Sequence, residues 1–117
     1  MQTVNILGTE YTVYIEPTDG NKKLSECNGY TDYTTKEIHL KDFKAESLDL
    51  MSLDNLPIYR DKVIRHEIIH AFLLESGLDS NSSYSDTWAT NEEMVDFFAM
   101  QFPKIHKVYI ELGCTGE

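Results

Sequence analysis

The sequence has little cysteine, few basic residues and no long apolar run, and each shortage narrows the class of protein. Cys27 and Cys114 are the only cysteines in 117 residues, too few for a disulfide scaffold or a thiolate metal cluster. We expect two reduced thiols, as in a cytoplasmic protein, with a single bridge between them as the alternative. The apolar runs are short and broken by charges, and no basic and apolar leader is visible. We therefore expect neither a membrane span nor a secretory signal.

Basic residues are outnumbered by acidic ones. Lys and Arg number 10 against 20 Asp and Glu, so the formal net charge is −10. Such a chain repels phosphate backbones, which argues against a nucleic-acid partner. The length suits one domain with its own core, and no repeat or low-complexity segment divides it. We expect residues 1–117 to form a single domain and to be monomeric.

The first third of the chain has the alternating apolar pattern of β-strands. Alternation on both sides of Gly8 predicts a hairpin over residues 3–7 and 10–16. A turn follows, and a second pair of short strands is predicted over 28–33 and 36–41. The next stretch, up to Pro57, is acidic and irregular.

The remainder of the chain is predicted to be helical. Apolar spacing indicates one helix over residues 57–76, with Gly77 in the position of a left-handed C-cap. Residues 78–89 are polar and predict a surface loop, in which Trp88 is expected to reach the core. Gly77 and this loop separate the first helix from those that follow.

Two shorter helices are predicted after that loop. The first covers residues 91–102, begins with a capping box of Thr90 and Glu93, and stops at Pro103. The second covers residues 104–112 and ends at a glycine. The predicted fold class is α+β, with a small, mostly antiparallel sheet packed on the helices.

His66, Glu67 and His70 form an H-E-x-x-H motif inside the first predicted helix. Residues four apart lie on one helical face, so both imidazoles can reach one metal ion. Glu67 lies about 100° around the helix from His66, where it can contact a zinc-bound water and take its proton. Composition alone would produce this motif about once in a hundred such chains, so its context has to support it.

A zinc catalytic site usually has three protein ligands, so a third is needed. In the metzincin pattern a glycine and a third histidine follow the second histidine by three and six residues. Leu73 and Ser76 stand at these places, which excludes that class.

Glu92 and Asp96 offer the missing groups on the following helix. They lie four residues apart and share a face with apolar residues, so we expect that face to point inward. Buried carboxylates need compensation, which a zinc ion would supply to Glu92 and an imidazole N–H to Asp96. Glu93 is the alternative ligand, but the capping box with Thr90 would occupy it.

These five residues, with 21 residues between His70 and Glu92, resemble the motif of the gluzincins, the thermolysin-like zinc metallopeptidases. The stretch after Asp96 is similar to the ImmA/IrrE-type peptidases of prophages and mobile elements, and the whole chain resembles small phage-type minimal gluzincins. The resemblance implies a zincin-like fold, Glu92 as third ligand and Asp96 behind a ligand histidine. The specific motifs cover about residues 63–103.

The predicted function is a Zn²⁺-dependent endopeptidase acting on a protein or peptide substrate. His66, His70 and Glu92 hold the metal, Glu67 activates the water, and Asp96 orients a histidine. One alternative is a non-catalytic, zinc-stabilised interaction module of phage or prophage origin. Another is a domain without metal, in which the motif arose by chance.

Two further histidines and several tyrosines are also candidates for the site. His39 is expected to face solvent, with a place in the cleft as the alternative, and His106 is expected at the surface rather than on the metal. The tyrosines that could donate to an oxyanion, each expected to pack or face solvent instead, are Tyr30, Tyr33, Tyr84 and Tyr109.

Overall fold

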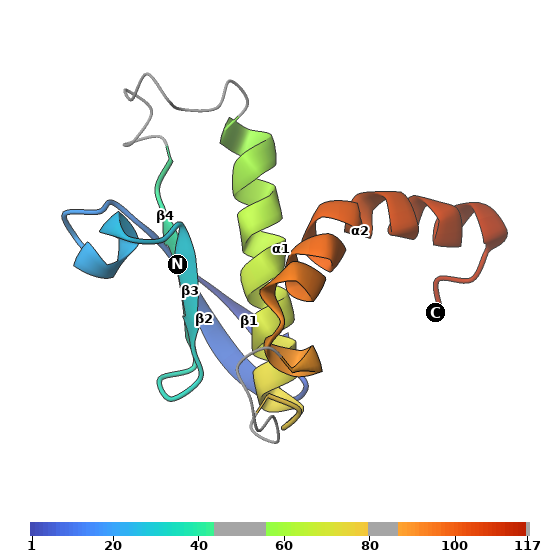
Figure 1. The fold of residues 1–117 in the computed structure, drawn as a ribbon, viewed down its shortest axis with the longest axis horizontal. Helices are drawn as coiled ribbons and strands as arrows, with labels where there is room; N and C mark the ends of the chain where they lie inside the picture. The colour runs from blue at the N-terminus through green and yellow to red at the C-terminus, as the bar shows by residue number, and fades with distance from the viewer. Residues whose placement is uncertain (44–55, 80–86, 117) are drawn as a thin grey trace.

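A computed structural model describes residues 1–43, 56–79 and 87–116, and the fold is α+β (Figure 1). The strands are β1 (Gln2–Ile6), β2 (Thr9–Glu16), β3 (Gly29–Asp32) and β4 (Glu37–Lys41). The helices are α1 (Leu56–Glu75) and α2 (Glu92–Leu112), with short 3-10 helices η1 (Lys22–Ser25) and η2 (Trp88–Thr90). Most of the predicted irregular segment before Pro57 and of the loop 78–89 lies outside the described residues.

The predicted hairpin is confirmed as β1 and β2. The two strands pair antiparallel, and Ile6 lies opposite Thr9. The two residues between them, Leu7 and Gly8, both have positive φ, at 52° and 92°. A two-residue turn in which both φ angles are positive matches the right-handed twist of the strands that it joins. The Asn5 side chain accepts a hydrogen bond of 2.8 Å from the Gly8 N–H and holds the turn closed.

The sheet is mixed, with the strand order β1-β2-β4-β3. The second predicted pair, β3 and β4, is confirmed and antiparallel, but β4 joins the hairpin through a parallel pairing with β2. Two of the three pairings are antiparallel, as expected, and the parallel pairing of β2 with β4 was not predicted. The connection after β2 passes through η1, which lies on the face of the sheet opposite α1 (Figure 1).

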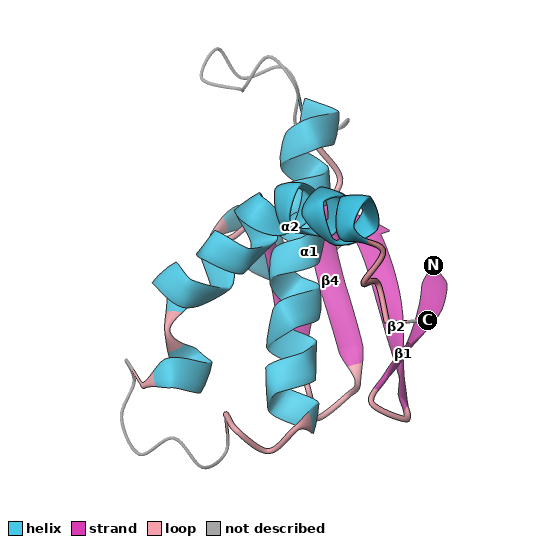
Figure 2. Ribbon diagram, turned by 90° about the vertical axis from the view of Figure 1, so that its right-hand side faces the viewer, coloured by secondary structure: helices cyan, strands magenta, loops and turns pink. Residues whose placement is uncertain are grey.

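The core lies between the sheet and α1, which runs along the strands in Figure 2. Every second residue of β4 is buried on this face, so Ile38 and Leu40 meet the inward side of α1. Burial of these side chains is the main source of stability that holds α1 in place. The buried members of this core are Ile6, Tyr11, Ile38, Leu40, Phe43, Val63 and Ala71.

His39 lies on the other face of β4. The prediction that it faces solvent is wrong. Its side chain is only 13% exposed and is stacked between the rings of Tyr14 and Tyr30, each with its centroid 4.9 Å away. One ring nitrogen contacts the Glu16 carboxylate, and Nε2 lies 2.9 Å from Glu37. Since its neighbours Ile38 and Leu40 point to α1, His39 is turned away from the side of the sheet that α1 covers.

The long helix α1 matches the predicted helix over 57–76 within a residue at each end. Gly77 follows it with φ at 85°, a left-handed conformation that favours glycine. Trp88 is exposed rather than anchored in the core, and Ala89 is the buried residue of η2. Among the described residues, no helix is both long and apolar enough to cross a membrane.

The two helices predicted over residues 91–102 and 104–112 form one continuous helix in the structure. Residues 92–112 are continuous, and Pro103 lies inside α2. Proline has no N–H, so the Ala99 carbonyl loses its usual helical donor. Arg65 of α1 supplies a replacement, because its Nε–H donates to the Ala99 oxygen at 2.7 Å. Figure 1 shows α2 bent, with its second half directed away from α1.

The predicted capping box at the start of α2 is also wrong. Asn91 is the N-cap, and its side-chain oxygen accepts a hydrogen bond of 2.7 Å from the Met94 N–H. Thr90 belongs to η2, so it cannot cap α2. The helix begins at Glu92, one residue after the predicted start at residue 91.

His39 should stabilise the folded state more near pH 6 than at higher pH. Burial lowers the pKa of His39, but hydrogen bonds to the Glu16 and Glu37 carboxylates outweigh burial and raise it above its ordinary value. Such a group stabilises the fold below its unfolded pKa of about 6.5 and loses that contribution as pH rises through its folded pKa. We expect the free energy of unfolding, measured by urea denaturation in EDTA, to fall as the pH is raised above about 6. The fall should be smaller in His39→Gln than in the wild type.

The matched control is His106→Gln, because His106 is exposed on α2. This control should keep the wild-type pH dependence. An identical pH dependence in the wild type and in His39→Gln would show that the charged imidazole contributes nothing to stability.

Arg65→Ala should cost about 1–3 kcal/mol of stability, because it leaves the carbonyl of a buried residue without a donor. In a Pro103→Ala background the restored N–H can donate to the Ala99 oxygen, so the same change should cost less. Urea denaturation of the two single variants and the double variant measures this coupling. Arg60→Ala is the control, because the Arg60 guanidinium on the same helix contacts the exposed Asp61 side chain. An equal cost in both backgrounds would contradict the assignment.

Candidate metal centre

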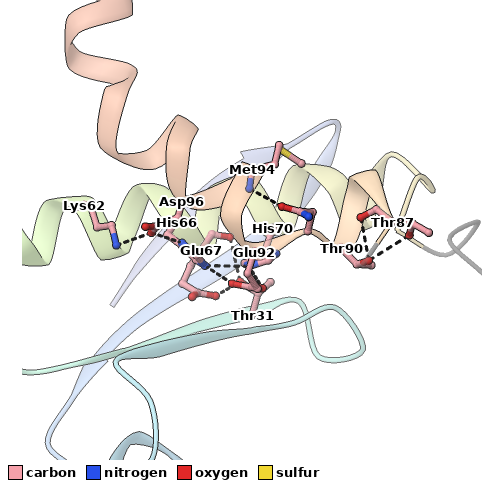
Figure 3. A network of polar contacts seen from close by, with 11 residues as sticks. Thr31, Lys62, His66, Glu67, His70, Thr87, Thr90, Glu92, Met94 and Asp96 are labelled. Atoms are coloured by element: carbon pink, nitrogen blue, oxygen red, sulfur yellow. Dashed lines mark hydrogen bonds and ion pairs between the residues drawn. The ribbon is translucent and has the colours of Figure 1, made fainter. Parts of the chain in front are cut away.

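Two histidines of α1 and one glutamate of α2 point at a common position (Figure 3). His66 and His70 lie one turn apart on the face of α1 that meets the start of α2. Their Nε2 atoms are 3.1 Å from each other, and each is 3.0 Å from an oxygen of Glu92. The structure thus brings together the three residues that the sequence predicted as ligands.

The donor set suits a divalent metal ion such as zinc. A tetrahedral ion with bonds of 2.0–2.1 Å has ligand atoms about 3.3 Å apart, close to the observed 3.0–3.1 Å. Two imidazoles with one carboxylate are also a known catalytic zinc ligand set. Without a cation, the unprotonated Nε2 of His66 would direct its lone pair at a carboxylate oxygen. A metal ion or a proton has to separate these groups.

Asp96 lies one turn beyond Glu92, beside the other nitrogen of His66. Its Oδ1 is 3.3 Å from His66 Nδ1 and 2.5 Å from the Lys62 ammonium. The hydrogen bond from Lys62 is the main reason that the pKa of Asp96 is lowered, with a smaller contribution from His66. An ionised Asp96 favours a proton on Nδ1, which leaves the Nε2 lone pair free for a metal.

Glu67 occupies the boundary between the site and the core. It is 7% exposed and is the single charged residue that is buried within the described residues. The Thr31 hydroxyl of β3 lies 2.9 Å from its Oε1, close enough to donate a hydrogen bond to it. Burial raises the pKa of Glu67, and this effect outweighs the hydrogen bond from Thr31 and the two nearby histidines. A carboxylate of raised pKa beside a candidate metal site is suited to accept a proton.

A close approach of β3 to α1 makes this contact possible. Gly29 lies on the strand where a Cβ atom would come within 2.9 Å of the Leu40 side chain and 3.3 Å of Glu67 Cγ. Any larger residue would therefore crowd the Leu40 and Glu67 side chains and force them to shift. The absence of a side chain at Gly29 lets Thr31 reach Glu67.

A cavity of about 440 Å³ opens between β3, α1 and the start of α2. The three candidate ligands, Glu67 and Asp96 all line it, and residues 28–31 form its opposite wall. Because β3 is an edge strand of the sheet, its outer edge has no strand partner among the described residues. The cavity therefore combines a candidate metal site with a strand edge that can pair with an extended chain.

Four further cavity residues were missed by sequence reasoning. Thr31 holds Glu67, Lys62 holds Asp96, and the Asn28 amide donates to the Tyr59 hydroxyl at 2.5 Å. Lys62 and Tyr59 lie four and seven residues before His66, so the helical period could have placed them on its face. Asn28 and Thr31 could not be found in this way, because only the tertiary packing brings β3 to α1.

The other candidates lie outside the metal centre. His106 is exposed on α2 and stacks on Phe102. Tyr30 stacks on His39 at the opposite face of the sheet, and Tyr33 and Tyr109 are exposed. Tyr84 lies outside the described residues. Cys27 and Cys114 are both free thiols, as the sequence predicted.

Comparisons of the chain with protein-family models, curated proteins and solved structures return no match. The resemblance to gluzincins therefore rests on the five motif residues and their spacing. The geometry of these residues carries the functional hypothesis.

Wild-type protein purified without a metal-affinity tag should contain zinc by elemental mass spectrometry, and His66→Ala should not.

Asp96→Asn should weaken zinc binding about 10–100-fold, because the His66 ring loses the acceptor that orients it. Competition with a chromogenic chelator measures the affinity. Glu93→Gln is the matched control, since Glu93 is exposed beside Glu92 and outside the ligand group. Equal effects of the two variants would remove Asp96 from the site.

Proposed function

We propose that this chain is a zinc-dependent peptide-bond hydrolase, with His66, His70 and Glu92 as the metal ligands. The observation that carries the proposal is the position of Glu67. It is a buried carboxylate of raised pKa that lines the same cavity as the ligand group. Burying a carboxylate costs free energy, and a purely structural metal site gains nothing from placing one there.

In this proposal zinc supplies a Lewis acid that activates water and polarises the scissile carbonyl. Glu67 accepts the proton of the attacking water as the new C–O bond forms. It then passes that proton to the amide nitrogen as the C–N bond breaks, so the products are a carboxylic acid and an amine. Thr31 holds one carboxylate oxygen of Glu67, which leaves the other available for this proton. Asp96 acts through His66 and is a positioning residue.

The form of the cavity favours a protein or peptide as substrate. An extended segment can add to the outer edge of β3, where backbone hydrogen bonds would place a peptide bond beside the ligand group. The resemblance to peptidases of prophages and mobile elements further suggests a specific protein substrate. We place this activity in the cytoplasm, in keeping with two free thiols.

Glu67→Gln should keep the zinc content of the wild type and lower peptide hydrolysis by about 10²–10⁴-fold, because an amide cannot accept the proton. The assay is cleavage of a fluorescence-quenched peptide library, followed by mass spectrometry of the products. Glu93→Gln is again the control and should retain full activity.

Each outcome decides between the candidate functions. Full turnover by Glu67→Gln would remove Glu67 from the mechanism. A wild-type protein that holds zinc but cleaves no peptide would favour the non-catalytic zinc module. Protein that takes up no zinc during dialysis would contradict both functions and leave a motif that arose by chance.

A further inference from the structure

The second half of α2 stands clear of the rest of the molecule (Figure 1). From Phe102 to Leu112 every residue is exposed except Ile105, which is half-buried. The bend at Pro103, held by the contact of Arg65 with Ala99, directs this half of the helix outward. The helix therefore has a surface that packs on nothing within the described part of the chain.

One side of this helix is apolar. Phe98, Phe102, Ile105, Tyr109 and Leu112 follow each other at spacings of four, three, four and three residues. This is the spacing of the apolar positions in helices that pair with other helices. Four of these side chains are 43–74% exposed. We call these five residues the apolar face of α2.

We propose that the apolar face of α2 is the contact surface between two copies of this chain. The spacing is self-complementary, since a helix that presents this pattern can pair with an identical helix about a two-fold axis. The same pairing would cover Phe97 and Val108, which flank the face and are also half exposed. This inference replaces the monomer that the sequence favours, and it is independent of the proposed catalytic function.

The area of the face is sufficient for a specific dimer. An apolar side chain that is half exposed offers about 100 Å² to a partner, so six of them offer about 600 Å² per copy. The six are the four exposed members of the face and two that flank it: Phe98, Phe102, Tyr109 and Leu112, with Phe97 and Val108. A symmetric pair would bury about 1,200 Å², which is the lower end of the range for specific protein interfaces. Contiguous apolar surface of this size on a soluble chain marks an interaction site.

The local charge permits self-association although the whole chain is strongly acidic. Two copies with a net charge of −10 repel each other. The half-helix from Pro103 to Leu112, however, holds two lysines and one glutamate, so two positive charges less one negative charge give +1. The acidic excess is therefore absent at the proposed contact. Because the remaining repulsion is long-range, added salt should strengthen the dimer.

The test is sedimentation velocity of the 117-residue chain under reducing conditions, from about 1 to 100 µM, a range that detects dimers of micromolar affinity. We expect wild-type protein to shift from 13.5 kDa to twice that mass as its concentration rises. A double variant, Phe102→Glu with Tyr109→Glu, should stay at 13.5 kDa over the same range. Both side chains are exposed, so the changes should leave the fold intact, which far-UV circular dichroism checks.

The control is Met100→Glu. Met100 is 53% exposed on the same helix, but it lies about 140° around the axis from Ile105. This variant should dimerise like the wild type. Wild-type protein that stays monomeric at about 100 µM, or a double variant that dimerises equally well, would overturn the proposal. So would a Met100→Glu variant that weakens association as much as the double variant, because the contact would then be unspecific.

Discussion

The packing of α1 between the sheet on one side and α2 on the other is the constraint on which the rest of the structure depends. Its inward side buries Val63 and Ala71 against the strands, and Glu67 lies on the same side between them. Its other side carries His66 and His70 to the start of α2. A shift of α1 by one residue, about 100° of rotation, would remove both the core contacts and the ligand geometry.

This arrangement makes stability and the candidate chemistry compete for the same helix. Two imidazoles, the exposed Glu92 carboxylate and the buried Glu67 converge in one cavity, and a buried carboxylate such as Glu67 is costly without compensation. Two residues of the protein partly stabilise the carboxylates of the cavity, because Thr31 contacts Glu67 and Lys62 contacts Asp96. A bound cation would stabilise the converging ligand groups further, so occupancy of the site would also stabilise the α1–α2 contact.

The elements that local pattern predicted correctly are those whose hydrogen bonds are made within one segment or one short hairpin. The first hairpin and α1 are of this kind, and the spacing of His66 and His70 placed both on one face. Two of the errors occurred where a distant group replaced a local one. Pro103 does not end α2, because Arg65 supplies a donor from another helix. His39 is largely covered because residues of three strands surround it. Neither partner is visible from the sequence around the residue.

The sequence by itself determined the α+β composition, the two histidines on one helical turn, and the residue types from which a metal centre could be built. Its alternation defined the strands, but strand pairing is a choice among partners of similar pattern, so the parallel contact of β2 with β4 was decided only by the tertiary structure. The same holds for Thr31 beside Glu67, and for the apolar face of α2. Helical spacing determines which residues share a face, whereas the packing of the whole chain decides whether that face is covered.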